Sequence, residues 1–390
     1  MALMAFCGLG NQIVLALTSR PSEESFRLVW DKRYGDDRFW NEYKAMAIGK
    51  NGETLIAVSA RNAPDANDAK INRLLLWRID QKGDITSETE VKKPQGSSKS
   101  VAKTPMSAAI KDLAVLENGD ALLIVDFEGG HPSIVKVDRS GRQSLTKNIA
   151  APSRHISLFK MVPASDGKFL LLGHESMDAF AIEIDASGNV LWERKTDRGK
   201  MDLFVDGITN QDGEFILIGN SGQYDILLGG PSDVWISRYD ANGGVKDEKS
   251  FQGRYGRVVQ TQEGSYGVVY DKGTSDRQDI RLKLLDLDLK EVWESQLLTV
   301  TPGFLDFKIA ALPGGGFIVA GGKDGKPLVA RVDVNGKKIG TFQNDAKMPI
   351  DIGNYGLVQR NDEILVSSSV IDIKDKTIVT RKIRMMRIIL

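Results

Sequence analysis

Short apolar runs alternate with polar turns along almost the whole chain, and none has the periodicity of an amphipathic helix over a useful length. The clearest unit, residues 165–195, reads SDGKFLLLGHESMDAFAIEIDASGNVLWERK. It contains a glycine turn, an apolar strand, a short gap, a strand that ends in aspartate, a second glycine turn and a more polar strand. Short strands separated by such turns predict an all-β fold.

The same unit recurs, which is the signature of a repeat architecture. Each copy is preceded by a further apolar strand, so that one unit holds four strands. The other copies, from the clearest to the least complete, occupy residues 211–251, 313–342, 50–91, 117–149, 262–297 and 360–390.

Two turn positions fix the register of the copies. The first, such as DG at 166, joins two apolar strands and is a hairpin signal. The second is Asp-x-x-Gly, in which the aspartate accepts hydrogen bonds from turn amides and the glycine takes the left-handed conformation. Each such turn supplies one carboxylate, far fewer than the six or more oxygens of a calcium site, so we interpret it as structural. The aspartates are Asp80, Asp138, Asp185, Asp240, Asp286 and Asp333, of which Asp286 lacks the following glycine.

The spacing of these aspartates sets the number of units. They lie 46 to 58 residues apart, so the chain after its first residues holds about seven units. Four strands in each unit predict a single seven-bladed β-propeller of four-stranded antiparallel blades over residues 25–390. Horseshoe and β-helix folds have shorter repeats.

The two ends of the chain predict how the ring closes. The last unit lacks a fourth strand, whereas RLVWDKRY at 27–34 resembles the fourth strands NVLWERK and EVWESQL of other units. We therefore expect residues 27–34 to complete the last blade, which removes an exposed sheet edge. The final strand, RKIRMMRIIL, carries apolar and basic residues on both faces and predicts a β-bulge or an edge position.

Residues 1–24 are a candidate leader segment. Residues 1–19 carry no charge, and Val14 and Ala16 fit a cleavage rule for small residues, which favours a periplasmic or secreted protein. No basic residue precedes the apolar run, so a misassigned start or an apolar terminus without function stays open. Phe6 before the lone Cys7 disfavours lipid attachment. No other stretch is long and apolar enough for a transmembrane helix.

Composition and charge exclude several classes of function. The 390 residues carry 52 basic and 52 acidic side chains, which weakens any interpretation as a nucleic-acid binder. One cysteine excludes an internal disulfide framework and Cys-based zinc fingers. The glycine-rich stretch 316–326 lacks phosphate-loop spacing. We expect a monomer with no cofactor and no bound metal.

Part of the repeat resembles known propeller families. The pattern Asp-x-x-Gly-x-x-x-Trp at 185–192, with Trp30 and Trp293 in looser copies, resembles the tryptophan-docking repeat of quinoprotein-like propellers. DVWISRYDANGG at 233–244 resembles repeats of bacterial secreted and lipoprotein propellers. The resemblance implies a bacterial, extracytoplasmic propeller. It does not extend to a quinone cofactor, because no cofactor-binding set is matched.

The tryptophans of the repeat, including Trp77 and Trp235 on third strands, are expected to pack between blades rather than stack on a ligand. Phe39 and Trp40 precede the first inner strand and lie outside the repeat. They are the better candidates for an exposed anchor, because tryptophan is enriched at interaction hot spots.

Loop lengths predict one functional face. The turns from first to second and from third to fourth strands are short, whereas long segments fall on the connections of the opposite rim, which we call the loop-rich face. Function concentrates on variable loops held by a rigid scaffold. A histidine metal or catalytic cluster is the alternative there to solvated histidines. The candidate binding residues are Phe39, Trp40, Arg61, His131, His155, His174, Tyr224 and Asp276.

The central opening is the second candidate site. Charged residues or histidine stand near the start of successive inner strands, at Lys44, Lys111, His155, Asp202, Arg257, Asp306 and Asp351. We favour a wet polar channel and a non-enzymatic propeller that binds a protein or glycan through its loop-rich face. The alternative is a hydrolase or lyase that acts at the opening on a small or carbohydrate substrate.

Overall fold

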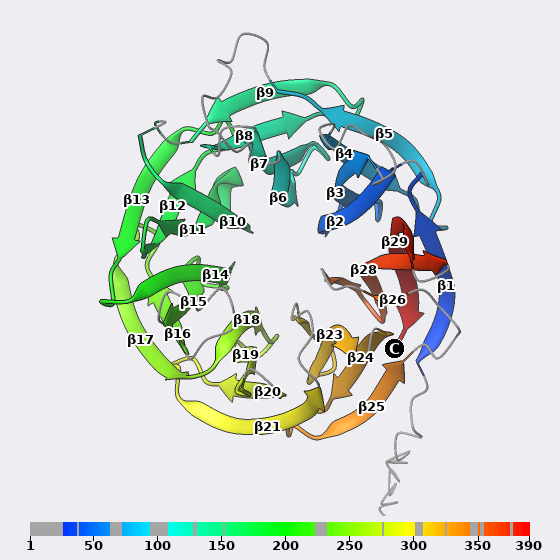
Figure 1. Ribbon diagram of the computed structural model, residues 1–390. Coiled ribbons are helices and arrows are strands. Elements are labelled where there is room, and N and C mark those ends of the chain that lie inside the picture. The colour runs from blue at the N-terminus through cyan, green and yellow to red at the C-terminus, as the bar shows by residue number, and fades with distance from the viewer. Residues whose placement is uncertain are drawn as a thin grey trace, which may run out of the picture.

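The computed structural model describes residues 26–36, 39–62, 72–93, 108–127, 131–149, 151, 153–222, 232–274, 277–300, 307–323, 326–343, 350–351, 355–374 and 377–390. The candidate leader, residues 1–24, lies outside the described residues. Five separate four-stranded sheets and one nine-stranded sheet surround a common axis (Figure 1). The nine-stranded sheet consists of the first and last blades, so the predicted seven-bladed, all-β propeller is confirmed.

Each blade runs antiparallel from the axis to the rim. The inner strands are β2 (Phe39–Ile48), β6 (Ala109–Val115), β10 (Ile156–Pro163), β14 (Met201–Thr209), β18 (Arg254–Gln260), β22 (Lys308–Ala311) and β27 (Gly356–Arg360). The second strands are β3 (Thr54–Asn62), β7 (Ala121–Phe127), β11 (Phe169–Glu175), β15 (Phe215–Gly222), β19 (Tyr266–Asp271), β23 (Phe317–Lys323) and β28 (Glu363–Lys374).

The third strands are β4 (Asn72–Ile79), β8 (His131–Val137), β12 (Asp178–Ile184), β16 (Ser232–Tyr239), β20 (Gln278–Leu285), β24 (Lys326–Val332) and β29 (Thr377–Ile389). The outer strands are β5 (Ile85–Val91), β9 (Gln143–Asn148), β13 (Val190–Thr196), β17 (Val245–Gln252), β21 (Glu291–Val300), β25 (Lys338–Gln343) and β1 (Arg27–Tyr34). A two-residue strand, β26 (Ile350–Asp351), also pairs with β28, and a 3₁₀ turn spans Ser165–Gly167.

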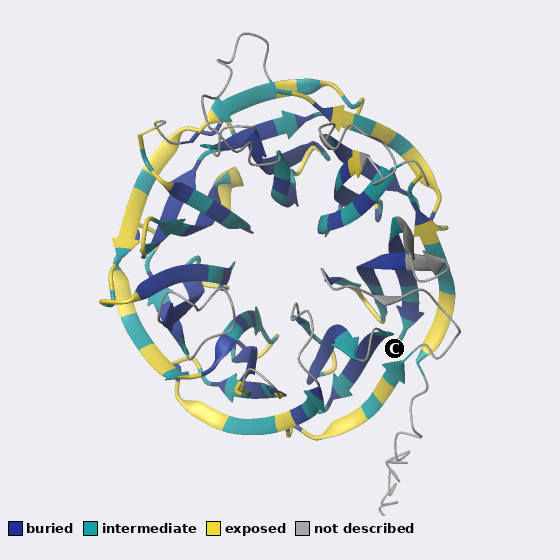
Figure 2. Cartoon of the chain, in the orientation of Figure 1, coloured by how far each residue is buried: buried dark blue, intermediate teal, exposed yellow. Residues whose placement is uncertain are grey.

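Position within the blade explains the composition of each strand. Second strands such as β7 and β15 are buried along their whole length, because neighbouring blades cover both of their faces (Figure 2). Their sequences are accordingly near-continuous apolar runs. Outer strands such as β13 are largely exposed and polar.

The core is a series of layers between neighbouring blades. One layer joins the first and second blades through residues such as Leu55 and Leu123, and another joins the sixth and seventh through Val329 and Met386. Every neighbouring pair of blades shares such a cluster. The disc is therefore held together by apolar burial around the entire ring.

The N-terminal strand closes the ring as predicted. β1 pairs antiparallel with β29, from Arg27 opposite Ile389 to Tyr34 opposite Ile383. The Arg384 guanidinium, 1% exposed, donates to both carboxylate oxygens of Asp31 at 2.9 and 2.6 Å. A buried bidentate pair of this kind fixes the register of the two ends.

β29 is an interior strand, not an edge. It pairs with β28 on one side and with β1 on the other, and the irregularity in the β1 pairing lies between Leu28 and Trp30. Its apolar residues are buried on both faces, in the layers toward the sixth and the first blades. The predicted edge position was therefore wrong. Bulges do accompany this strand, one in β1 opposite Arg387 and Ile388 and one in β29 itself between Ile378 and Thr380.

Tryptophans of outer strands pack on the Asp-x-x-Gly turn of the next blade. The Trp192 indole Nε1 donates to the Ala241 carbonyl at 3.3 Å, and a Cβ at Gly243 would lie 3.0 Å from its ring. Trp293 contacts the turn at Gly336 in the same way. Trp30 packs against Gly83 across the closing junction. The predicted packing between blades is thus the role of these three side chains.

The fourth blade is one of those whose outer strand has no tryptophan at this position. Asp247 stands seven residues after Asp240, where Trp192 stands after Asp185. The facing turn has Leu289 at a φ of 58°, where the other turns have glycine. In every one of these turns one aspartate oxygen accepts two backbone amides, for example those of Ser187 and Asn189 on Asp185. Each of these aspartates is thus a structural acceptor for the amides of its own turn.

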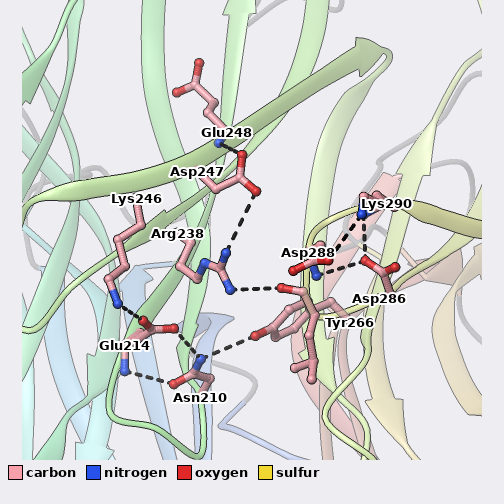
Figure 3. Close-up of polar contacts among 11 residues, drawn as sticks. Asn210, Glu214, Arg238, Lys246, Asp247, Glu248, Tyr266, Asp286, Asp288 and Lys290 are labelled. Carbon is pink, nitrogen blue, oxygen red and sulfur yellow. Dashed lines mark hydrogen bonds and ion pairs between the residues drawn. The ribbon is translucent and has the colours of Figure 1, made fainter.

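Side chains join the blades on the short-turn face as well (Figure 3). The Asn210 side-chain oxygen accepts the amides of Asp212 and Glu214, and its Nδ2 donates to the Tyr266 hydroxyl of the next blade at 3.3 Å. Arg238 donates to the carbonyl of Leu287 at 2.9 Å. At this junction side-chain hydrogen bonds therefore link the fourth and fifth blades on the short-turn face.

Substitution of two glycines of the fourth blade would distinguish the cost of backbone strain from the cost of disturbing tryptophan docking. Gly243 and Gly213 both have a φ of +78°, but a Cβ at Gly213 meets nothing within 4 Å. Gly213→Ala should cost about 1 kcal/mol for the left-handed backbone. Gly243→Ala should cost about 1–3 kcal/mol more, because Trp192 must move. Equal shifts in urea denaturation would contradict a docking role for Trp192.

The closing ion pair gives a second prediction. Asp31→Ala leaves Arg384 buried without its counterion and should cost about 3–5 kcal/mol in the free energy of unfolding. The double variant Asp31→Leu/Arg384→Met should recover most of that loss. Glu117→Ala, which removes the exposed Lys50–Glu117 pair, is the control and should leave stability unchanged. A double variant as unstable as Asp31→Ala would contradict this account.

Candidate functional site

A polar cavity of about 450 Å³ lies on the axis of the ring, and all seven inner strands contribute to its lining. Its apolar walls include Met46, Val205 and Leu357. Its charged lining consists of Lys44, Lys111, Lys160, Arg257 and Lys308, with Asp112 and Asp206.

Bulges in the inner strands bring these side chains to the axis. The pairing with the second strand skips one residue at Lys44, at Lys111, at Phe159 and at Val205. A bulge leaves one residue unpaired and redirects side chains. The bulged residue and the one after it therefore both reach the cavity.

Two aspartates of the cavity connect neighbouring blades. Asp112 Oδ2 accepts the backbone amide of Met161 in the third blade at 2.8 Å. Asp206 Oδ2 accepts the amide of Val258 in the fifth blade at 3.0 Å. These carboxylates thus bond backbone amides of β10 and β18, which are edge strands of their sheets.

Two lysines of the cavity have carboxylate partners. Lys160 lies 3.4 Å from Asp112, and this negative charge outweighs burial and raises the pKa of Lys160. Lys111 lies 3.2 Å from Asp126, whose pKa is raised by burial and lowered to a lesser extent by Lys111. Such a lining can hold water or a small polar ligand by hydrogen bonds.

Only some of the predicted channel residues line the cavity. Lys44, Lys111 and Arg257 line the cavity. Asp202 is fully buried in β14 and accepts the amide of Arg198 at 2.7 Å, whereas His155 is exposed before β10. Asp306 and the side chain of Asp351 lie outside the described residues.

Four charged lining residues escaped the sequence prediction, namely Asp112, Lys160, Asp206 and Lys308. They stand on inner strands opposite the fourth residue of each second strand, as Asp112 stands opposite Ile124. Aligning the copies on the inner strand would have found this position. The prediction used the strand starts, which lie nearer the loop-rich face.

The loop-rich face is described only in part. Every connection from an inner to a second strand, and from a third to an outer strand, is a short described turn. The undescribed residues inside the propeller all fall on the other two kinds of connection. Tyr224 and Asp276, two of the predicted binding residues, are among them.

The three histidines are on the second and third blades. His131 begins β8, with its Nδ1 buried and without a hydrogen-bond partner among the described residues. His174 Nδ1 lies 2.9 Å from the Ser176 carbonyl oxygen, and burial lowers the pKa of His174. Within the described ranges no three His, Cys, Asp or Glu residues are grouped so as to hold a metal ion.

Phe39 and Trp40 begin the inner strand β2 instead of preceding it, and both are half-buried. Arg73 lies over the Phe39 ring, with its Cζ 5.5 Å from the centroid. Arg61, which is exposed, lies over the Trp40 ring at 5.7 Å. Three of the predicted binding residues are thus together where the last and first blades meet.

Comparison with known proteins shows the fold. No family model and no curated protein sequence matches the chain. In structure it is similar to virginiamycin B lyase from Staphylococcus aureus, with 10% identity, a TM-score of 0.54, and 94% of this chain and 100% of that one covered. The polysaccharide lyase Uly1 has 9% identity and a TM-score of 0.55, with 93% and 100% covered.

A WD40 domain is as similar to this chain as the two lyases are. The WD40 domain of Toxoplasma gondii coronin has 9% identity and a TM-score of 0.54, with 92% of this chain and 86% of that one covered. The structural neighbours are thus β-propellers that include both lyases and a WD40 domain. In the described part of this chain, no helix has the length and apolarity needed to cross a membrane.

The cavity carboxylates give a prediction for stability. Asp206→Ala removes the acceptor of the buried Val258 amide and should cost about 1–3 kcal/mol. Asp206→Asn keeps an acceptor oxygen and should recover part of the loss. Lys44→Ala is the control, because its partner Glu42 remains partly solvated. Urea midpoints that fall as far for Lys44→Ala as for Asp206→Ala would contradict a bridging role for Asp206.

Proposed function

We propose that this chain is a non-enzymatic binding propeller that recognises a protein or glycan partner through its loop-rich face. The observation that carries the proposal is the asymmetry between its two faces. On one face the connections are short turns whose backbone amides bond within the turn and whose side chains bond across blade junctions. The long connections of the chain, which differ in length from blade to blade, belong to the other face.

The rest of the disc suits this role. Apolar layers and bridging side chains hold neighbouring blades in fixed positions, so the loops are displayed by a rigid support. A pre-organised support lowers the ordering cost of association. The protein would act as a monomer, because the closed ring covers the apolar faces of its blades with one another.

The comparisons and the repeat resemblance support this proposal at different levels. A WD40 domain among the structural neighbours is consistent with a binding propeller, and the lyases keep the enzymatic alternative open. The repeats at 185–192 and 233–244 resemble bacterial extracytoplasmic propellers. We therefore place the proposed partner in the periplasm or outside the cell.

The central cavity favours the second candidate, a hydrolase or lyase. It has lysine and aspartate side chains within reach of one another, such as Lys160 and Asp112, which acid–base chemistry requires. We rank it second because Asp112 and Asp206 are already engaged by backbone amides of the next blade.

Affinity capture from an envelope extract of the source cell tests the proposal. Phe39→Ala/Trp40→Ala should lose the partner that the wild-type chain captures, because these side chains lie on the loop-rich face at the closing junction. Val190→Ala/Leu191→Ala is the matched control, since it removes two half-exposed apolar side chains from an outer strand. This control should retain capture.

The captured partner is then purified and its binding to each variant is measured, with circular dichroism to confirm folding. Equal binding by the Phe39→Ala/Trp40→Ala variant would contradict the proposed face. Turnover of the partner, abolished by Lys160→Met, would instead favour the enzyme.

A further inference from the structure

A cluster of two arginines and one tryptophan lies at the junction that closes the ring. Trp40 of β2 is opposite Arg61 of β3 and is also in parallel register with Arg381 of β29. The Arg381 Cζ lies 4.3 Å from the Trp40 ring centroid, and that of Arg61 lies at 5.7 Å. Two guanidinium groups thus share one indole ring. We call these three residues the arginine–tryptophan cluster.

This cluster lies on the loop-rich face. Arg61 is next to the end of β3, Arg381 follows the start of β29, and Trp40 is the second residue of β2. The end of a second strand and the start of a third strand adjoin the connection between them, and the start of an inner strand adjoins the connection from the previous blade. Both kinds of connection belong to the loop-rich face. The cluster is therefore at the face that the proposed function assigns to the partner.

Several arginines of the described structure have carboxylate partners, but Arg61 and Arg381 have none within its described residues. The guanidinium pairs include Arg154–Glu175, Arg254–Asp271, Arg281–Asp279, Arg384–Asp31 and Arg387–Glu363. Glu42, the acid whose charge acts on Arg381, is bound to Lys44 at 2.9 Å. Among the described residues, the cluster therefore has an excess of positive charge.

Buried donors in the cluster also lack acceptors. Arg381 Nε and Trp40 Nε1 are both buried and, among the described residues, without a hydrogen-bond partner. Burial and, to a lesser extent, the charge of Arg61 lower the pKa of Arg381. Unsatisfied buried donors beside a like-charge pair cost free energy in the unbound protein. An incoming oxyanion would accept hydrogen bonds from these donors and would balance the two positive charges.

We propose that the arginine–tryptophan cluster is the binding site for carboxylate groups of an acidic segment in a protein partner. Arginine matches a carboxylate through two parallel hydrogen bonds. Clusters of arginine recognise acidic motifs, and arginine and tryptophan are the residue types that dominate protein interaction hot spots. The proposal rests on the proposed function and specifies the chemistry of its partner.

Fluorescence anisotropy with a fluorescein-labelled octaglutamate peptide tests the site on the full chain at low salt. The wild-type chain should bind, and Arg61→Gln and Arg381→Gln should each weaken binding about tenfold or more. Arg142→Gln is the matched control, because it removes the same charge from an exposed turn on the opposite face. It should bind as the wild type does. No binding by the wild type, or equal losses for Arg142→Gln and Arg61→Gln, would overturn the proposal.

A charge reversal separates loss of the site from loss of the fold. Arg61→Glu places a carboxylate beside Arg381, so it should abolish peptide binding while the melting temperature stays at or above that of the wild type. A lower melting temperature would show that the charge of Arg61 is already balanced within the chain, and would overturn the proposal.

A second probe distinguishes the kind of partner. An oligogalacturonate of matched charge should bind more weakly than octaglutamate, and tighter binding that the same variants abolish would replace the protein partner with an acidic glycan. Failure of the proposed function is distinguishable, because capture that does not depend on Phe39 and Trp40 would reject the loop-rich face. Failure of the wild-type chain to bind the peptide, while capture still depends on Phe39 and Trp40, would reject only the cluster.

Discussion

Closure of the ring is the constraint on which the other features of this propeller depend. Each blade buries both faces of its second strand against its neighbours, so an open ring would expose two apolar blade faces to water. The chain meets this constraint with its two ends. β1 is the outer strand of the last blade and pairs with β29, its third strand. The buried Arg384–Asp31 pair fixes the register of the two strands. Trp30 then packs on the Gly83 turn of the first blade, so the same contact that joins other blades also joins the ends.

The closing junction and the axis carry the charged groups that could act on other molecules, but in different states. On the axis, inner-strand bulges direct lysines and aspartates into one cavity, where the aspartates are engaged by amides of the next blade and lysines have carboxylate partners. These charged groups thus mainly stabilise the contacts between blades. At the junction, Arg61 and Arg381 lie over Trp40 without such partners among the described residues. A rigid disc can hold two like charges close together because the strands that carry them are fixed by the blades.

Repetition explains what was predictable from the sequence. The Asp-x-x-Gly turns recur, so their aspartates gave the blade count, and the likeness of residues 27–34 to other fourth strands gave the closure. The candidate site was less predictable. Bulges depend on pairing between strands, so the one-residue shift that brings Asp112 and Lys160 to the axis is not visible in the hydrophobic pattern. Trp40 and Arg381 are 341 positions apart and meet only because the ring closes, so no local pattern could indicate their contact.

Hydrogen–deuterium exchange of the propeller, with and without its purified partner, tests the central claim most directly, namely that the loop-rich face at the closing junction is the binding surface. We predict that the partner slows exchange at the start of β2, the end of β3 and the start of β29, and leaves the turns at 80–84 and 185–189 unchanged. Protection of those turns or of the outer strands, with no change at the three strand ends, would contradict it.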